Sequence, residues 1–365
     1  MRIDPARGLW VRAPTPLGDF LAAEPALRAL ADAFAESGHA QALTITAPNR
    51  MAELVAPRFR GARSLPSEIP EPELVARVRG HGAALLLAGS FRSAWTAARA
   101  RIPIRVGLAR DGRGWLLTDA IRPALERGAT PLHRGVRGRA PRTLPRPGAA
   151  TYTELLGALG IAVRDPRPRL AARPEVARTM GEQLAGCGLD PGRPFLTASI
   201  GGAGGAVAKS PPPSVWVRLL GRLHRELGWP LLLAPGLGDE SVAREVRDGL
   251  PRGATTLLDP ERAPDLEELT ALFGRSAAVL TGDTGPRHLA RAVGTPAVVL
   301  VGSTDPRHTA LRPSAEQVLR GELPCAPCHR AICPRPTGPE PSGVDRECLV
   351  AIDPERVLEA LVQLL

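Results

Sequence analysis

Short apolar runs alternate with longer amphipathic segments along the first part of the chain. The short runs predict strands at residues 9–12, 42–46, 83–88 and 105–108. The amphipathic segments predict helices at residues 24–35, 71–79 and 92–99. Because strands that alternate with helices are typical of a mainly parallel, helix-covered sheet, we expect a Rossmann-like first domain.

The pattern changes over residues 118–150, a stretch rich in arginine, proline and glycine that we interpret as a mobile loop. A predicted helix at 151–159 follows, and then a second series of strands begins near residues 195, 231, 255, 277 and 297. The sequence thus predicts an α/β protein of two Rossmann-like domains, 1–168 and 169–365.

Residues 276–306 predict a strand, a short helix and a second strand, with a polar loop after each strand. The first loop is Gly282–Gly285, followed by Pro286 at the helix start, and the second is Gly302–Asp305. In open α/β sheets ligands gather at the carboxyl ends of strands, and free amides at a helix start favour anions. The two loops therefore predict a phosphate-binding site.

A helix cap is the competing interpretation of Asp283 and Thr284, and the loop alone leaves the two equally open. His288 favours a binding site, because a cap does not need it. In the first helical turn the positive end of the dipole favours the neutral imidazole, which can donate or accept a hydrogen bond at neutral pH.

This stretch resembles the donor-binding signature of glycosyltransferase family 9, the ADP-heptose:lipopolysaccharide heptosyltransferases. That signature is D-T-G-x-x-H followed by G-P-T-D-P, and the chain departs from it at Ser303, where the family usually has proline. The resemblance implies a GT-B architecture, in which the two domains face a central cleft. It also makes the last helix, 354–365, a candidate to cross back onto the first domain, as in other proteins of this architecture. It also implies an ADP-heptose donor, a lipopolysaccharide inner-core acceptor, and donor contacts from Asp283, Thr284, Gly285 and His288.

Lys209 is the single lysine among the 47 basic residues, which are otherwise arginine. It ends a glycine-rich loop that begins at Ser199, after a predicted strand, and both residues are candidates to bind the donor. An ammonium is a compact charge that a planar guanidinium does not replace at a crowded phosphate. The alternative is an ordinary surface lysine. The family usually has tryptophan and proline shortly after this lysine, whereas the chain has Ser210-Pro211.

Inverting sugar transfer needs a base for the acceptor hydroxyl and stabilisation of the departing diphosphate. Asp19 follows the first predicted strand in an L-G-D loop, and a P-A-L-R segment comes after it. Family 9 proteins open in this way, so the resemblance implies that Asp19 is the catalytic base; the alternative is a helix cap. Lys209 is the candidate to stabilise the leaving group.

The chain contains no Asp-X-Asp pair, which fits a reaction that needs no metal cofactor. By analogy with other nucleotide sites, Asp239 or Glu240, after the strand near residue 231, is a candidate to hold the ribose or the base. A solvated loop acid is an equal alternative for each of them.

Arginines in the first half are the candidates to bind an anionic acceptor. Arg105, Arg110 and Arg113 resemble a family segment at that surface, and a solvated basic strand edge is the alternative. Residues 118–150 contain seven more arginines, which could bind anionic lipid head groups beside a membrane-bound acceptor. These seven are Arg122, Arg127, Arg134, Arg137, Arg139, Arg142 and Arg146.

Four of the five cysteines have metal-ligand spacing in a proline-rich segment near the end of the chain: Cys325, Cys328, Cys333 and Cys348. Four thiolates can close a tetrahedral structural zinc site, and free thiols or disulfides are the alternatives. Similar clusters recur in some family 9 sequences. Cys187 stands alone and is expected to be a small buried residue.

The net charge of +10 indicates an anionic partner. A basic nucleic-acid-binding protein is one alternative, but the chain is only 3% aromatic and shows no recognition helix or stacking motif. No apolar run approaches the roughly 18 residues of a membrane span, and MRIDPARGLWVRAPTP lacks a signal peptide's apolar stretch. We therefore expect a cytoplasmic enzyme, with the inner face of the cytoplasmic membrane as a candidate location.

Overall fold

The computed structural model describes residues 3–55, 59, 61–123, 146–190, 192–201, 206–257, 262–309, 315–333 and 346–365. The chain divides into two compact units. The first comprises Met1–Pro168 with Arg307–Leu311, and the second Arg169–Pro306 with Arg312–Leu365. Within the described residues, no helix has both the length and the apolar composition that crossing a membrane requires.

The first unit is built on a parallel sheet, whose described strands have the order β3-β2-β1-β4-β5-β6. Its strands are β1 (Leu9–Arg12), β2 (Leu43–Ala47), β3 (Arg63–Pro66), β4 (Ala83–Leu86), β5 (Ile104–Leu108) and β6 (Asp119–Ile121). Its helices are α1 (Leu17–Glu36), α2 (Asn49–Val55), α3 (Glu71–Val78), α4 (Phe91–Arg99) and α5 (Gly148–Ala158). Short 3-10 turns lie at η1 (Pro5–Arg7), η2 (Ala40–Ala42) and η4 (Gly114–Leu116).

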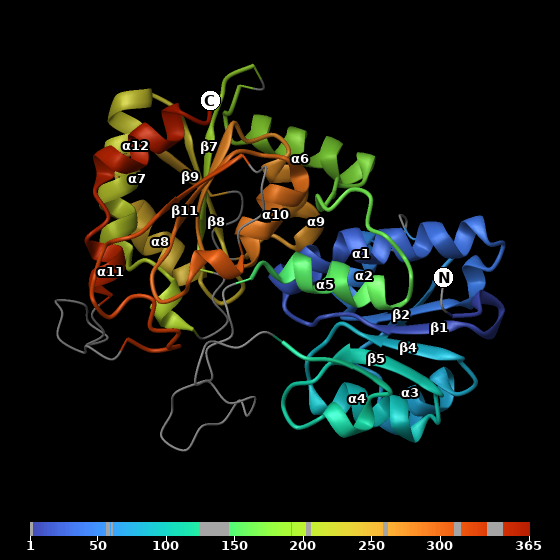
Figure 1. Cartoon of the computed structure of the whole chain (residues 1–365). Helices are drawn as coiled ribbons and strands as arrows, with labels where there is room; N and C mark the ends of the chain where they lie inside the picture. Colours follow the sequence, from blue (N-terminus) through green and yellow to red (C-terminus); the bar gives the residue numbers. More distant parts are fainter. Residues whose placement is uncertain are drawn as a thin grey trace. The chain divides into compact units, whose positions relative to one another are not determined.

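Helices cover both faces of this first sheet, with α1 and α5 on one face and α3 and α4 on the other (Figure 1). On the second face, fully buried Trp10 packs with Leu86 of β4 and Leu116 of η4 in one apolar cluster. The Trp10 indole donates a hydrogen bond of 2.9 Å to Thr46 Oγ1, so the buried polar atom of this large ring is satisfied.

Helix α1 begins at Leu17, seven residues before the predicted start. A helix that began at residue 24 would have Pro25 in its first turn, but the structure has this proline inside the helix. A proline there removes one backbone hydrogen bond. Apolar burial offsets the loss, because Phe20, Leu27 and Leu30 are buried along one side of the helix. Asp19 therefore lies in the first turn of α1 and not in a loop before it.

The arginine-rich stretch is only partly described. Strand β6 and the start of α5 lie within 118–150, where the sequence analysis expected a loop. Arg122 is exposed, and Arg146 forms an ion pair with Glu154 of α5. The other five arginines of this stretch fall outside the described residues.

The second unit also has a parallel sheet, whose described strands have the order β12-β11-β10-β7-β8-β9. Its strands are β7 (Leu196–Ile200), β8 (Leu231–Pro235), β9 (Thr255–Leu257), β10 (Ala278–Gly282), β11 (Ala297–Leu300) and β12 (Glu316–Leu319). Its helices are α6 (Pro174–Gly186), α7 (Pro213–Leu227), α8 (Glu240–Asp248), α9 (Leu266–Phe273), α10 (Gly285–Val293), α11 (Glu347–Val350) and α12 (Pro354–Val362). Turn η5 (Val207–Lys209) also belongs to this unit, and turn η6 (Pro306–His308) lies where the chain passes from the second unit to the first.

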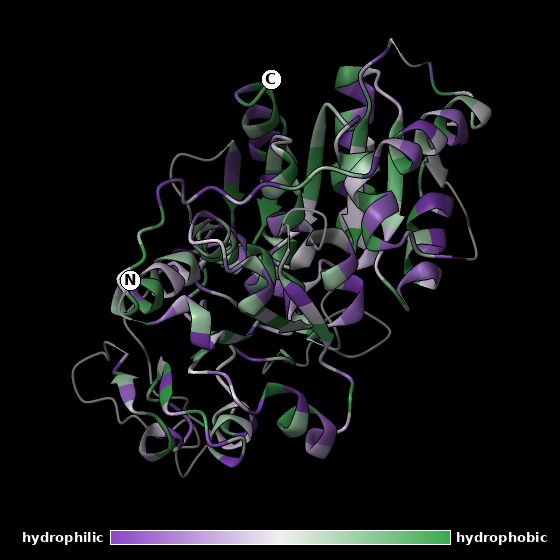
Figure 2. Ribbon diagram, turned by 90° about the vertical axis from the view of Figure 1, so that its right-hand side faces the viewer, coloured by the Kyte–Doolittle hydropathy of each residue, from purple (hydrophilic) through white to green (hydrophobic). Residues whose placement is uncertain are grey.

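Helices α7, α8 and α12 cover one face of the second sheet, and α6, α9 and α10 cover the other (Figure 1). Coloured by hydropathy, the strands are mainly apolar and the helices carry polar outer stretches (Figure 2). Buried Trp216 of α7 shares a core with Val357 and Leu361 of α12. The last helix therefore uses its apolar face within the second unit.

Candidate functional site

The second unit has a topological switch point between β7 and β10. These neighbouring strands pair in parallel, with Ser199 opposite Thr281, and the strand order runs in opposite directions from them. Their carboxyl ends meet at one edge, where loops diverge and leave room for a ligand. The Lys209 segment follows β7 and the loop Asp283–Gly285 follows β10, so the structure brings these two predicted donor-binding segments together.

Glycines let the Lys209 segment lie against the strand ends. A methyl group at Gly282 would lie 3.1 Å from the Lys209 carbonyl oxygen, and one at Gly302 only 2.8 Å from that of Ala208. Larger residues at these two positions would push the segment away. Lys209 is half-buried at the end of η5, close to the start of α10. Residues 202–205 of the glycine-rich loop lie outside the described part.

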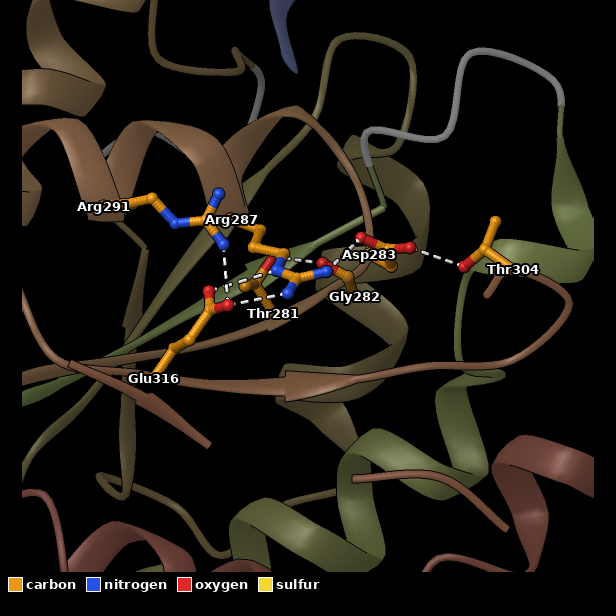
Figure 3. Close-up of polar contacts among 7 residues, drawn as sticks. All are labelled: Thr281, Gly282, Asp283, Arg287, Arg291, Thr304 and Glu316. Atoms are coloured by element: carbon orange, nitrogen blue, oxygen red, sulfur yellow. Dashed lines mark hydrogen bonds and ion pairs between the residues drawn. The ribbon is translucent and has the colours of Figure 1, made fainter. Parts of the chain in front are cut away.

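A buried charge network supports the loop after β10 (Figure 3). Arg287 of α10 is fully buried, and its Nη1 lies 2.7 Å from Asp283 Oδ1. Its Nη2 lies 2.7 Å from Oε1 of Glu316, which Arg291 Nη2 also contacts at 2.6 Å. Thr304, from the loop after β11, donates to Asp283 Oδ2 at 2.5 Å. The network thus ties two loops, one helix and β12 together.

The charged state of this network is set by its partners. Burial alone would raise the pKa of Asp283, but the Arg287 charge and the Thr304 hydrogen bond outweigh it and lower that pKa. For Glu316, hydrogen bonds and charge from Arg287 and Arg291 likewise outweigh burial and lower the pKa. Both carboxylates are therefore ionised at neutral pH.

Asp283 has a different role from the predicted donor contact. Its side chain is only 4% exposed, and Arg287 and Thr304 each contact one of its carboxylate oxygens. The Asp283 carboxylate therefore holds its loop against α10 and the loop after β11. These contacts position the next two residues, Thr284 and Gly285.

The start of α10 offers donors to an anion. Thr284 is the N-cap residue, and no hydrogen bond from its side chain caps the helix. Its Oγ1 is buried without a hydrogen-bond partner among the described residues, and the same is true of Ser303 Oγ. Buried hydroxyls normally have partners, so the Thr284 hydroxyl keeps unused hydrogen-bonding capacity at the start of α10, whereas Ser303 lines the cavity beside the clustered cysteines. The α10 dipole adds positive potential there.

His288 lies in the first turn of α10, as predicted, and is buried. Burial lowers its pKa to about 3, and the charges of Arg291 and Arg287 act in the same direction. The imidazole is therefore neutral at physiological pH, as the sequence analysis expected, although burial and not the helix dipole is the main cause.

The remaining predicted donor residues lie around the carboxyl ends of β7 and β8. Ser199 is buried within β7. Gly201 has φ +80°, and a methyl group there would lie 2.1 Å from Asp239 Oδ2, so the Asp239 carboxylate lies directly over the end of β7. Glu240 accepts from the Gly238 amide at 3.3 Å, and bonds from its own and the Gly238 backbone lower its pKa. Of the two acids, Asp239 is the better placed for a ligand at the switch point.

A polar cavity adjoins these acids at the carboxyl end of β8. It is lined by Met180, Gln183, Leu233, Ala234, Pro235, Arg262, Pro264 and Glu268. Arg262 and Glu268 form an ion pair at 2.7 Å. The lining combines Gln183 and this ion pair with aliphatic side chains, so it can both hydrogen-bond to and pack against a flat heterocycle such as a nucleotide base.

In the first unit, Asp19 is exposed in the first turn of α1, after the carboxyl end of β1. Tyr152 of α5 is buried near Asp19. Burial raises the pKa of the Tyr152 hydroxyl, and the charge of Asp19 raises it further. Arg110, whose charge also acts on Tyr152, follows β5 and lies over Gly89 in the loop after β4. These groups gather at the carboxyl edge of the first sheet.

Two of the three predicted acceptor arginines are corrected by the structure. Arg113 is fully buried, and its guanidinium donates to Leu108 O at 2.8 Å, Ala88 O at 2.5 Å and Ser93 Oγ at 2.9 Å. Arg105 lies near the amino end of β5, where its guanidinium donates at 2.6 Å to the carbonyls of Leu116 and Ile102. Both support the backbone, which leaves Arg110, 42% exposed, as the acceptor candidate.

None of the four clustered cysteines forms a disulfide, and all four line one small cavity together with Ala208, Ser303, Leu323, Ala326, Arg346 and Glu347. Burial raises the pKa of Cys348 to about 11, with further contributions from Cys333, Cys328 and Cys325. Within the described part, no three His, Cys, Asp or Glu side chains are already arranged to hold a metal ion. Cys187 is exposed and not buried as expected, because it caps the outer end of α6.

Sequence reasoning missed Arg287, Glu316, Thr304 and Tyr152. Arg287 and Arg291 lie four residues apart on α10, and this spacing was a signal of a shared carboxylate between them. Nothing in the sequence pointed to Glu316, because it belongs to a strand that the pattern did not predict.

The model of glycosyltransferase family 9 (heptosyltransferase) matches residues 149–337. The chain belongs to this family. It is a glycosyltransferase, and its two parallel sheets match the GT-B fold of solved heptosyltransferases. A comparison with curated proteins finds no match.

Among solved structures, the chain is similar to ADP-heptose lipopolysaccharide heptosyltransferase II of E. coli, with 22% identity, 98% of each chain covered and a TM-score of 0.71. A family 9 glycosyltransferase from Veillonella parvula has 18% identity, a TM-score of 0.72, and coverage of 100% of this chain and 98% of that one. E. coli heptosyltransferase WaaC with ADP-2-deoxy-2-fluoro heptose has 15% identity, a TM-score of 0.59, and coverage of 96% and 98%. At these identities the likeness shows the fold.

The buried His288 gives a testable pH dependence. Its folded pKa of about 3 lies below its ordinary value of about 6.5, so the unfolded chain binds the extra proton first as pH falls. The neutral imidazole therefore contributes its full share to the free energy of unfolding above pH ~6.5. This contribution is lost as the pH falls toward ~3, and the free energy of unfolding then decreases by up to ~1.4 kcal/mol per pH unit. The carboxylates of Asp283 and Glu316 also lower the free energy of unfolding when they are protonated, but only below pH ~4.

Urea unfolding at pH 7, 6 and 5 measures this slope. We expect His288→Gln to flatten it, whereas the control His39→Gln, at an exposed position, keeps the wild-type slope. His81, whose pKa is also lowered by burial, contributes equally to all three proteins. Equal slopes for wild type and His288→Gln would contradict the assignment.

Proposed function

We propose that this glycosyltransferase is an inverting, metal-independent heptosyltransferase. It moves L-glycero-D-manno-heptose from the ADP-activated donor to a lipopolysaccharide inner-core acceptor. One observation carries the proposal: buried Thr284 Oγ1, without a partner among the described residues, lies at the start of α10 beside the Lys209 segment. This arrangement suits a diphosphate at the β7/β10 switch point of a family 9 chain.

The donor's diphosphate would be bound by Thr284, the Gly285 amide and Lys209. As the bond to the sugar breaks, negative charge develops on the departing diphosphate, and a fixed ammonium and helix start stabilise it there. Asp239 would accept from the ribose, since its carboxylate lies over the end of β7. The base would enter the cavity at the end of β8.

The adenine preference is supported by what the similar structures are described as binding. WaaC of E. coli is described with ADP-2-deoxy-2-fluoro heptose and with ADP, and TibC with ADP-D-β-D-heptose. A different nucleotide sugar or glycan acceptor on the same scaffold is the rival proposal, because the loops do not identify the sugar.

Asp19 would act as the general base. It removes the proton of the acceptor hydroxyl as that oxygen attacks the anomeric carbon from the side opposite the diphosphate, which inverts the configuration. Exposure at the carboxyl edge of the first sheet leaves its carboxylate accessible to an acceptor. Arg110 in the same group would bind an anionic part of the acceptor. We propose that this takes place in the cytoplasm, at the inner face of the cytoplasmic membrane.

Calorimetry with ADP-, UDP- and GDP-sugars tests the donor. We expect ADP-heptose to bind most tightly, and Lys209→Ala to weaken binding by about tenfold or more because a charge-assisted contact is worth ~1.5–3 kcal/mol. Lys209→Arg keeps the positive charge but replaces the compact ammonium with a planar guanidinium, so we expect donor affinity between those of Lys209→Ala and wild type. Equal binding of all three donors, or unchanged affinity in Lys209→Ala, would remove the basis of the donor assignment.

Steady-state kinetics of Asp19→Asn tests the base. The substitution keeps the size of the side chain and removes its ability to take a proton, so kcat should fall by ~10²–10⁴ with little change in the KM for the donor. Asp32→Asn, at an exposed position on the same helix, is the matched control. A kcat for Asp19→Asn within a few-fold of wild type would rule Asp19 out as the base.

We also propose that the four clustered cysteines hold a structural zinc ion, separate from the chemistry. All four line one cavity, and four thiolates are a common structural zinc site. TibC, which is similar in fold with a TM-score of 0.56 and 17% identity, is described as iron-containing, so iron is the alternative metal. Metal binding would require the four sulfurs to move together.

Metal analysis of the protein as purified tests this site. We expect about one zinc per chain, lost in Cys325→Ser/Cys328→Ser together with part of the thermal stability, and kept in Cys187→Ser. Iron in place of zinc would correct the identity of the metal. A metal content near zero in wild type would overturn the site.

A further inference from the structure

The aromatic residues of the chain are unevenly distributed between interior and surface. It has five tryptophans, six phenylalanines and one tyrosine, all within the described residues. Only three of these side chains are exposed: Phe91 at 42%, Trp95 at 40% and Trp115 at 70%. We call these three residues the aromatic face.

The exposed rings lie together although they come from two elements. Phe91 begins α4 and Trp95 follows one turn later, with ring centroids 6.3 Å apart and nearly parallel planes. Trp115, in η4, lies 6.3 Å from Phe91 with its ring tilted. Exposing rings costs free energy in water, and a cluster of them on a folded protein generally marks an interaction surface.

Basic side chains border the aromatic face. Arg92 and Arg99 of the same helix are 70% and 49% exposed, and both lie near the same carboxylate, that of Glu71, at 3.8 and 3.7 Å. One acid thus faces two guanidiniums. The surroundings therefore favour an anionic partner.

We propose that the aromatic face docks on an anionic membrane surface. Tryptophan and phenylalanine rings favour the boundary between head groups and acyl chains, and arginines beside them bind lipid phosphates. The two signals together give reversible attachment, which neither provides well alone. This deepens the proposed function, since a lipopolysaccharide acceptor is itself held in a membrane. It places the attachment on α4 and η4, not only on the arginine-rich segment.

Vesicle co-sedimentation of the full chain tests the proposal. The vesicles are phosphatidylcholine alone, or phosphatidylcholine with about a third phosphatidylglycerol. The variant is Phe91→Ser/Trp95→Ser/Trp115→Ser, and the matched control is Val350→Ser/Val362→Ser/Leu365→Ser, which removes three exposed apolar side chains from the second unit. Equal thermal unfolding temperatures establish that the variants fold.

We expect wild type and control to bind the anionic vesicles, the aromatic variant to bind at least tenfold more weakly, and added salt to weaken binding. Trp fluorescence of wild type should shift to shorter wavelength on binding. If the aromatic variant fails to fold, Arg92→Ser/Arg99→Ser, which should reduce binding severalfold, decides the question. Equal vesicle binding by the folded aromatic variant and wild type would overturn the proposal, as would no binding by wild type.

Two further readouts separate other occupants of this surface. With an acceptor freed of its acyl chains, the aromatic variant should keep kcat/KM within about twofold of wild type; a large loss with vesicle binding unchanged would assign the rings to the acceptor glycan. A change of oligomeric state in the variant would assign them to a second copy of the chain. The vesicle assay contains no donor, so its result tests membrane docking independently of the ADP-heptose assignment.

Discussion

The ion pairs of buried Arg287 hold together the loops at the β7/β10 switch point of the second unit. This guanidinium has no contact with water, so its charge must be balanced inside the protein, and Asp283 and Glu316 balance it from opposite sides. Asp283 belongs to the loop after β10 and Glu316 to β12. The need to neutralise one buried charge therefore fixes the position of a loop relative to the sheet.

The loop position in turn determines what the start of α10 can offer. With Asp283 held from below by Arg287 and Thr304, Thr284 is left as an N-cap residue whose hydroxyl has no partner among the described residues. Neutral His288 adds no charge of its own in the same helical turn. A buried hydroxyl without a hydrogen-bond partner costs free energy, and a diphosphate that accepted a hydrogen bond from Thr284 would remove this cost.

The sequence predicted the parallel α/β architecture because its buried strands are continuous apolar runs between helical patterns. The pattern did not predict strands β3, β6 and β12, because these edge strands contain exposed or polar positions, such as Glu316 and Asp119. The start of α1 was missed because Pro25 has a strong local preference for a first turn, which tertiary packing of Phe20 and Leu27 overrides. Arg105 and Arg113 looked like ligand arginines because a sequence pattern does not report which guanidinium is used by nearby carbonyls.

We propose that the donor's diphosphate binds at the β7/β10 switch point of the second unit, and the structural interpretation depends on this step. Hydrogen–deuterium exchange with and without ADP-heptose tests it most directly, because bound phosphate oxygens accept from backbone amides and slow their exchange. We expect slower exchange at Thr284–His288 and around Lys209, with little change at the distant ends of the same strands. Protection elsewhere in the chain, with none at these two segments, would contradict it.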